Sequence, residues 1–231
     1  MESLLSVTLS EDDKKDIFTE ALLGSLYFEV ISDRLAEIPE AHRQTFNWIF
    51  QDPEATTGSW SSFKDWLKEG SGIYWIMGKA GSGKSTLMKF LIEDKRTKNL
   101  LLKPSRPVVV ANFFFWNSGG DLQKSKAGLL RSLLHQCLTQ QPLLAIKVFS
   151  ERWRHFRSLV EKTDSSWNGE HSLPSLIRAF KRLGTQISLQ TRFCFFIDGL
   201  DEYNGNHEDV VNLFNQSLHH RILECVFPAD R

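Results

Sequence analysis

The sequence predicts an α/β fold in which helices cover both faces of a mostly parallel sheet, and three observations lead to this prediction. Residues 108–116 and 192–198 are nearly continuous apolar runs, which are typical of strands buried on both faces. A third apolar run, residues 73–77, leads through a glycine-rich turn into an amphipathic helix. Apolar stripes at helical spacing fill the sequence between these runs, and strands that alternate with helices favour a parallel sheet.

The remaining segments are assigned from composition and periodicity. Residues 1–21 are polar and of mixed charge and predict an N-terminal arm or linker, whereas residues 22–70 predict a helical segment in front of the core. Within the core, residues 71–231, the basic stretch 95–107 and the polar stretch 163–171 each predict a loop. Two helical stripes consist of Leu129, Leu130, Leu133, Leu134, Cys137 and Leu138, and of Leu176, Ile177, Phe180, Leu183 and Ile187.

The glycine-rich turn has the composition of a phosphate-binding loop. Gly78, Gly81 and Gly83 permit backbone angles that other residues avoid, so consecutive N–H groups can form a concave nest around a phosphate. Lys84 adds a point charge, and an apolar strand before the loop and a helix after it supply the structural context that this motif requires. The predicted phosphate-binding residues are Gly78, Lys79, Ala80, Gly81, Ser82, Gly83, Lys84, Ser85 and Thr86.

The helix after the loop is expected to aim its positive N-terminal end at the same phosphates. Its apolar face is predicted to contain Leu87, Phe90 and Leu91. Lys89 and Glu93 are predicted to lie off that face.

A second element supplies carboxylates. The run 192–198 ends in Asp198, a Walker B arrangement in which one strand-end carboxylate, together with the Ser85 hydroxyl, is expected to hold hydrated magnesium. Gly199 follows, where many P-loop ATPases have a catalytic glutamate. Asp201 and Glu202 are therefore the candidate catalytic residues, either of which can polarise an attacking water. The alternative is that they cap the next helix, and for Asp201 we favour the functional reading.

These residues together resemble a known family. The loop of residues 78–86 combined with the Asp-Gly-Leu-Asp-Glu sequence of residues 198–202 is similar to the NACHT domain of signal-transducing STAND ATPases, and in particular to fungal NOD-like receptors. The likeness extends to residues 41–50, 113–119 and 128–134. It implies a P-loop NTPase sandwich and a nucleotide-controlled oligomerisation switch in innate-immunity-like signalling, with slow or absent hydrolysis.

The sequence also limits which nucleotide and which partners we expect. We expect ATP with Mg²⁺, because no Asn-Lys-x-Asp guanine-reading motif occurs, although GTP stays an alternative because NACHT domains as a group are NTPases. The 28 basic and 28 acidic residues balance, so no net field attracts nucleic acid. No run reaches membrane-spanning length and no signal peptide is evident, which favours a cytoplasmic protein. The expected partners are the nucleotide and either a second copy or a signalling protein.

Four further features invite a functional reading that the sequence does not favour. In the loop 117–121 and just after it, Asp121, Lys124 and Ser125 are candidate phosphate sensors, but a helix cap is the preferred role. The basic-aromatic cluster 152–157 has its aromatics at helical spacing, so we expect them to pack inward. His42 and Arg43 are weak candidates for nucleotide contacts, and a role on the surface of a helix is an equal alternative. The 3 cysteines lack metal-ligand spacing and are expected to be core thiols.

The C-terminal segment completes the sequence-based predictions. Compared with the family, the chain ends soon after the Walker B run, which predicts a C-terminally incomplete core. Residues 222–227 are the candidate for the family's sensor strand, expected between the strands of the phosphate loop and of Asp198, with residues around Val110 farther out. A P-loop kinase acting on a small molecule or nucleoside, and a degenerate scaffold without hydrolysis, are the alternative functions. The kinase is disfavoured because no arginine-rich lid segment follows the Walker B run.

Overall fold

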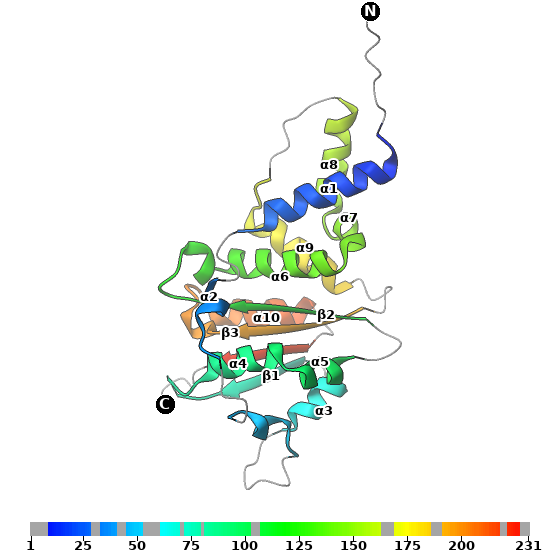
Figure 1. The fold of residues 1–231 in the computed structure, drawn as a ribbon. Coiled ribbons are helices and arrows are strands. Elements are labelled where there is room, and N and C mark those ends of the chain that lie inside the picture. The colour runs from blue at the N-terminus through cyan, green and yellow to red at the C-terminus, as the bar shows by residue number, and fades with distance from the viewer. Residues whose placement is uncertain are drawn as a thin grey trace, which may run out of the picture.

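A single parallel sheet forms the centre of the molecule. The structure is a computed structural model that describes residues 9–28, 33–40, 45–52, 61–69, 72–79, 81–102, 107–162, 169–185, 191–217 and 221–226. Strands β1 (Gly72–Met77), β2 (Val108–Phe114), β3 (Arg192–Asp198) and β4 (Arg221–Val226) form a 4-stranded sheet in the order β1-β4-β3-β2 (Figure 1). All three strand pairs are parallel, which confirms the predicted α/β class with its parallel sheet.

The last strand lies inside the sheet. In β4, Glu224 is paired in register with Trp75 of β1, and Ile222 is paired with Phe195 of β3. Val110 of β2 pairs with Cys194 on the outer side of β3. The position expected for the strand 222–227 is therefore confirmed for its described part, and β1 is an edge of this sheet.

Helices cover both faces of the sheet, and the two-residue periodicity of the strands decides which side chains face which layer. In β3, Phe193, Phe195 and Ile197 belong to one buried cluster with residues of α6, α9 and α10, whereas Cys194 and Phe196 belong to a second cluster with residues of α3 and α4. The helices are α1 (Glu11–Leu26), α2 (Asp33–Glu37), α3 (Phe63–Lys68), α4 (Lys84–Glu93), α5 (Lys95–Leu101), α6 (Lys126–Gln140), α7 (Ala145–Val148), α8 (Ser150–Glu161), α9 (Leu173–Thr185) and α10 (His207–Ser217). Short 3₁₀ turns are η2 (Asn47–Phe50), η4 (Asp121–Lys124), η5 (Pro142–Leu144) and η7 (Leu200–Glu202).

Both predicted helical stripes line the core. The whole α6 stripe, from Leu129 to Leu138, is fully buried, and so are Leu176, Phe180 and Leu183 of the α9 stripe. Ile177 is partly buried against the same cluster, and Ile187 lies outside the described residues. Cys137 and Cys194 are buried free thiols, as expected for core cysteines.

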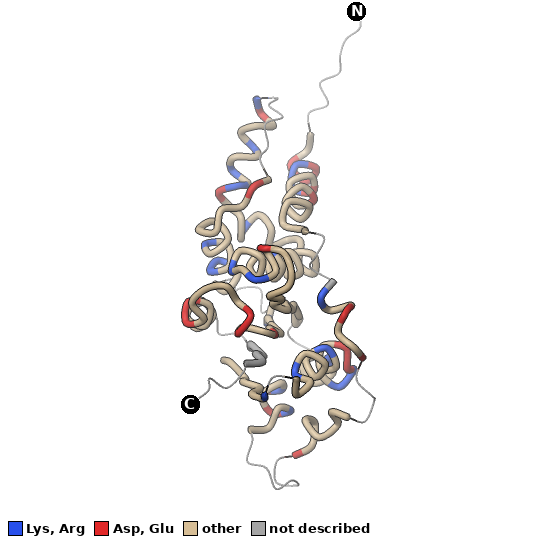
Figure 2. Tube along the Cα trace, turned by 90° about the vertical axis from the view of Figure 1, so that its left-hand side faces the viewer, with Lys and Arg blue, Asp and Glu red and all other residues tan. Residues whose placement is uncertain are grey.

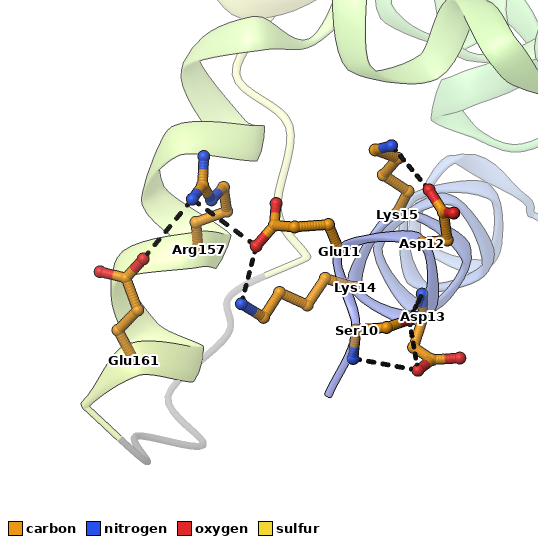
Figure 3. A network of polar contacts seen from close by, with 8 residues as sticks. All are labelled: Ser10, Glu11, Asp12, Asp13, Lys14, Lys15, Arg157 and Glu161. Atoms are coloured by element: carbon orange, nitrogen blue, oxygen red, sulfur yellow. Dashed lines mark hydrogen bonds and ion pairs between the residues drawn. The ribbon is translucent and has the colours of Figure 1, made fainter. Parts of the chain in front are cut away.

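The N-terminal region differs from the arm or linker expected up to residue 21, because a helix begins at Glu11. Phe18, Leu22 and Leu26 of α1 are each 0% exposed. Their spacing of four residues places them on one face of the helix, and the mixed charge of the segment belongs to its other faces. Ser10 and Asp13 form a capping box, and Glu11 contacts Arg157 of α8 at 3.7 Å (Figure 3).

One expectation in the region after the phosphate loop is wrong. The basic stretch 95–107 begins with a helix, α5, because the Asp94 side chain accepts a hydrogen bond from the backbone N–H of Arg96 and caps its first turn. Lys89, which is predicted to lie off the apolar face of α4, is nevertheless buried, with 8% of its surface exposed. Its Nζ donates a 2.8 Å hydrogen bond to the carbonyl of Ile38, which provides the partner that a buried ammonium requires.

The charged surface is mixed in sign. Figure 2 shows basic and acidic residues interspersed along the described helices. In the cluster 152–157, Phe156 is buried and Trp153 packs against Phe18 with ring centroids 5.3 Å apart, while Arg154 is exposed, so the inward packing of the aromatics is confirmed. Among the described residues, none of the helices is both long enough and apolar enough to cross a membrane.

Candidate functional site

The candidate site lies at the carboxyl ends of β1 and β3, which flank β4 in the sheet. Open α/β sheets bind ligands at this edge, because the loops that follow parallel strands all emerge there. The loop after β1 leads into α4, and Asp198 is the last residue of β3. A cavity of about 220 Å³ at this edge is lined by Gly81, Gly83, Lys84, Ser85, Thr86, Asp198, Gly199, Asp201 and Glu202.

The loop conformation depends on its glycines. Gly81 and Gly83 have φ values of +72° and +82°, in the left-handed region that favours glycine, and Gly83 is the N-cap of α4. At Gly78 the constraint is space, because a Cβ would lie 2.7 Å from Ser82 Oγ. Lys79 accepts a 3.2 Å hydrogen bond from the Ser82 N–H through its carbonyl. Ala80 lies outside the described residues, and Gly78, Lys79 and Ser82 belong to the loop without lining the cavity.

Lys84 brings positive charge to the cavity. Its side chain is buried, with 9% exposed, and its Nζ donates hydrogen bonds of 2.8 and 2.9 Å to the carbonyls of Gly78 and Lys79. These bonds connect the first residue of α4 to the beginning of the glycine-rich loop. The charge also acts across the cavity, because Lys84 lowers the pKa of Asp201 against the larger upward effect of burial.

Asp198 and Ser85 line the same cavity. The Asp198 carboxylate is only 4% exposed, and the Ser85 hydroxyl lies close enough to lower its pKa as a hydrogen-bond donor. Burial raises the pKa of Asp198 from 3.8 to about 6, with smaller upward contributions from Glu202 and Asp201 and downward contributions from Ser85 and Arg34. A strand-end carboxylate and a helix-start hydroxyl, which are far apart in sequence, thus present oxygen atoms to one place.

The two later acids reach the cavity because the chain turns at Gly199. This residue has φ +72°, and a Cβ there would lie 3.1 Å from the carbonyl oxygen of Phe115. The 3₁₀ turn η7 then places Asp201 and Glu202 on the cavity wall. Glu202 Oε2 accepts a 2.7 Å hydrogen bond from the Asn117 N–H, whereas Asp201 is more exposed and burial raises its pKa.

The loop after β2 supports the site without lining the cavity. Ser125 caps α6 by accepting a 3.1 Å hydrogen bond from the Gly128 N–H, and the Asp121 side chain is fully exposed, 3.9 Å from Lys124. Ser125 therefore has the helix-capping role that the sequence favours. The link between this loop and the site is the Asn117 N–H.

Arg34 is the residue near this site that sequence reasoning missed. It lies on α2, far before the phosphate loop in sequence, yet its charge lowers the pKa of Asp198. Its guanidinium carbon lies 5.4 Å from the ring centroid of Trp116, just after β2. No local pattern around Arg34 announces this position, because it results from how α2 packs. His42 and Arg43, the sequence candidates in the same segment, lie outside the described residues.

The donor set fits magnesium bound through a phosphate and differs from a cage of protein ligands. Among the described residues, no group of three or more His, Cys, Asp or Glu side chains has the arrangement of a metal site. Magnesium retains several waters and takes one or two protein oxygens plus phosphate oxygens in nucleotide sites, so the Ser85 hydroxyl and the Asp198 carboxylate suffice. The cavity is smaller than the roughly 300–1,000 Å³ of whole ligand pockets and suits phosphates and a cation rather than a base.

Comparison with known proteins places the chain in a family. A family model described as Nephrocystin 3, N-terminal, matches residues 44–226, which include the phosphate loop, Asp198 and β4. The chain belongs to this nephrocystin 3 N-terminal family. The family region is associated with NACHT-containing proteins, which agrees with the coarser part of the resemblance seen in the sequence. No curated protein and no solved structure gives a significant match to this nephrocystin 3 N-terminal chain.

Proposed function

We propose that this chain is the ATP-magnesium-binding switch module of a NACHT or STAND signalling protein, of the kind found in fungal NOD-like receptors, with slow or absent hydrolysis. The observation that carries the proposal is the single cavity lined by the glycine-rich loop, Lys84, Ser85 and Asp198. Phosphate binding needs the first part, and a hydrated divalent cation needs the second.

Each wall of the cavity has a separate role in this proposal. The backbone N–H groups around Gly81 and Gly83 and the N-terminus of α4 receive phosphate oxygens, and Lys84 neutralises their charge. Ser85 and Asp198 orient the hydrated cation. Magnesium, when bound, supplies further neutralisation of phosphate charge. ATP is proposed over GTP because the sequence has no guanine-reading motif, and the base lies outside this small cavity.

Asp201 is the residue proposed to polarise an attacking water. Glu202 already accepts a hydrogen bond from the Asn117 N–H, and we assign it the role of holding the loop after β2 against the site. Asp201 lines the same cavity and burial raises its pKa, as suits a base that works near neutral pH. The output of the switch is a change in contacts with a second copy or a signalling partner.

Equilibrium binding of a fluorescent ATP analogue to the full chain, with and without Mg²⁺, tests the proposal. We expect Lys84→Ala to weaken binding at least about tenfold, or ~1.4 kcal/mol, because it removes a charge next to the phosphates. The matched control is Lys147→Ala, which changes an exposed lysine on α7. Competition with unlabelled ATP and GTP tests the choice of base. Binding that Lys84→Ala leaves unchanged contradicts the proposal.

A further inference from the structure

We infer that Arg34, delivered by the helix α2 in front of the core, contacts the terminal phosphate of the nucleotide and makes the position of α2 depend on the number of phosphates. The inference rests on the proposed function and goes beyond it, because it assigns a phosphate contact outside the two sequence motifs. It also names the element through which the nucleotide state leaves the cavity.

Arg34 lies next to the cavity. Phe114, the last residue of β2, is paired in register with Asp198, and the Phe115 N–H donates a 2.9 Å hydrogen bond to the Asp198 carbonyl. Trp116 follows directly, and the Arg34 guanidinium lies over its ring. The contact therefore fixes Arg34 beside the end of the strand that carries the metal-binding carboxylate, and Figure 1 shows α2 beside the carboxyl end of β2.

The Arg34 guanidinium is held in place, but its Nε–H is still able to donate a hydrogen bond. Its Nε is buried and makes no hydrogen bond with any of the described residues. A buried N–H without an acceptor costs free energy, so such an atom in a native protein requires an explanation. A phosphate oxygen next to Asp198 is an acceptor of matching charge, and the planar fork of arginine binds phosphate with more than one hydrogen bond.

The loop after β2, which lies beneath Arg34, is itself connected to the site. A Cβ at Gly119 would lie 2.9 Å from Cε3 of Trp116, so the loop packs closely against the ring. The same loop is bonded to Glu202 through the Asn117 N–H. Arg34, Trp116, this loop and the acids of the cavity therefore form one continuous set of contacts.

The helix α2 is also connected to α4, the helix that follows the phosphate loop. Lys89 of α4 donates its buried hydrogen bond to the carbonyl of Ile38, directly after α2. The short helix is thus held at its end by α4, whose start forms the phosphate site, and at Arg34 by Trp116. A ligand that engages Arg34 closes this arrangement, and a diphosphate, which lacks the terminal group, leaves Arg34 without that contact.

Binding of nucleotides that differ in their terminal phosphate tests the inference. The affinities of the full chain for Mg²⁺ with a non-hydrolysable ATP analogue and for Mg²⁺ with ADP are measured in the wild type, Arg34→Gln and Arg34→Lys. Arg154→Gln, a change of an exposed arginine on α8, is the control. We expect Arg34→Gln to weaken triphosphate binding about tenfold with at most about a twofold effect on ADP. Arg34→Lys keeps the charge without the fork and should fall between.

The pattern of loss separates the possible explanations. A merely structural role weakens triphosphate and diphosphate binding equally, and this result, or unchanged binding in both variants, overturns the inference. If neither Arg34 variant folds, as judged by circular dichroism, the residue is structural and the inference also fails. A wild-type chain that binds no nucleotide overturns the proposed function as well. Binding that Lys84→Ala abolishes and Arg34→Gln leaves intact overturns the role of Arg34 alone.

Discussion

Replacement of Asp198 by Asn should make the metal-free protein more stable while removing the magnesium-dependent part of nucleotide binding. Asp198 is 4% exposed, and its pKa rises from 3.8 to about 6 in the folded protein, with burial as the main cause. Above pH 6 the charged carboxylate therefore costs about 3 kcal/mol relative to the unfolded chain. Asn has nearly the same shape, can accept a hydrogen bond from the Ser85 hydroxyl with its amide oxygen and carries no charge.

The dependence on pH gives this prediction its sign. A carboxyl group with a raised pKa binds its proton more tightly in the folded state, so its cost is greatest above pH 6 and falls as the pH drops from about 6 towards 3.8. The electrostatic part of the advantage of Asp198→Asn should accordingly shrink to roughly half between pH 7.5 and pH 5, so that the net advantage nearly disappears at pH 5. The buried amide N–H groups of Asn offset part of the gain, and we expect a net ~1–2 kcal/mol at pH 7.5.

Urea unfolding of the wild type and Asp198→Asn at several pH values, in the presence of EDTA, measures this difference. Asp201→Asn is the comparison variant, because Asp201 lines the same cavity but is more exposed, so its raised pKa should give a smaller gain in stability. The reasoning is refuted if Asp198→Asn is no more stable than the wild type at pH 7.5, or if its advantage stays constant on acidification.

Three further predictions address other parts of the molecule. Asp201→Ala should bind ATP like the wild type and lose any slow hydrolysis in a phosphate-release assay; a loss of binding equal to that of Asp198→Ala would mean that both carboxylates form one metal site. Phe18→Ala should cost ~3–5 kcal/mol in urea unfolding, because the ring is 0% exposed, whereas Ile17→Ala on the exposed side should cost under about 1; similar costs would show that α1 is not part of the core. Burial, together with Arg152 and Arg131, lowers the pKa of His171 from 6.5 to about 3, so the stability it contributes is complete above pH 6.5 and is lost towards pH 3. The stability of the wild type relative to His171→Gln should therefore fall between pH 7 and pH 5. A difference in stability that stays constant over this range would contradict the prediction.

Much of the fold follows from local sequence patterns. The apolar stripe of α6 and the run of β3 are buried as predicted, since period and composition are local properties that burial requires. The run of β2, which is an edge strand, is fully buried only at alternate positions over most of its length. The same locality explains why the loop of residues 78–83 and the turn at Gly199 appear where their glycines stand. The family resemblance predicts the position of β4, because strand order cannot be derived from the strand's own residues.

The candidate site is predicted by the sequence in its parts and assembled only by the tertiary structure. Ser85 and Asp198 are each identified by a local motif, but they line one cavity because β1 and β3 flank β4 with their carboxyl ends together. The glycine pattern, the strand-end carboxylate and the apolar periods are short-range features, and the sequence alone determines them. Arg34 beside Asp198, and Lys89 bonded to Ile38, depend on the packing of a short helix against residues distant in the chain, which no local pattern encodes.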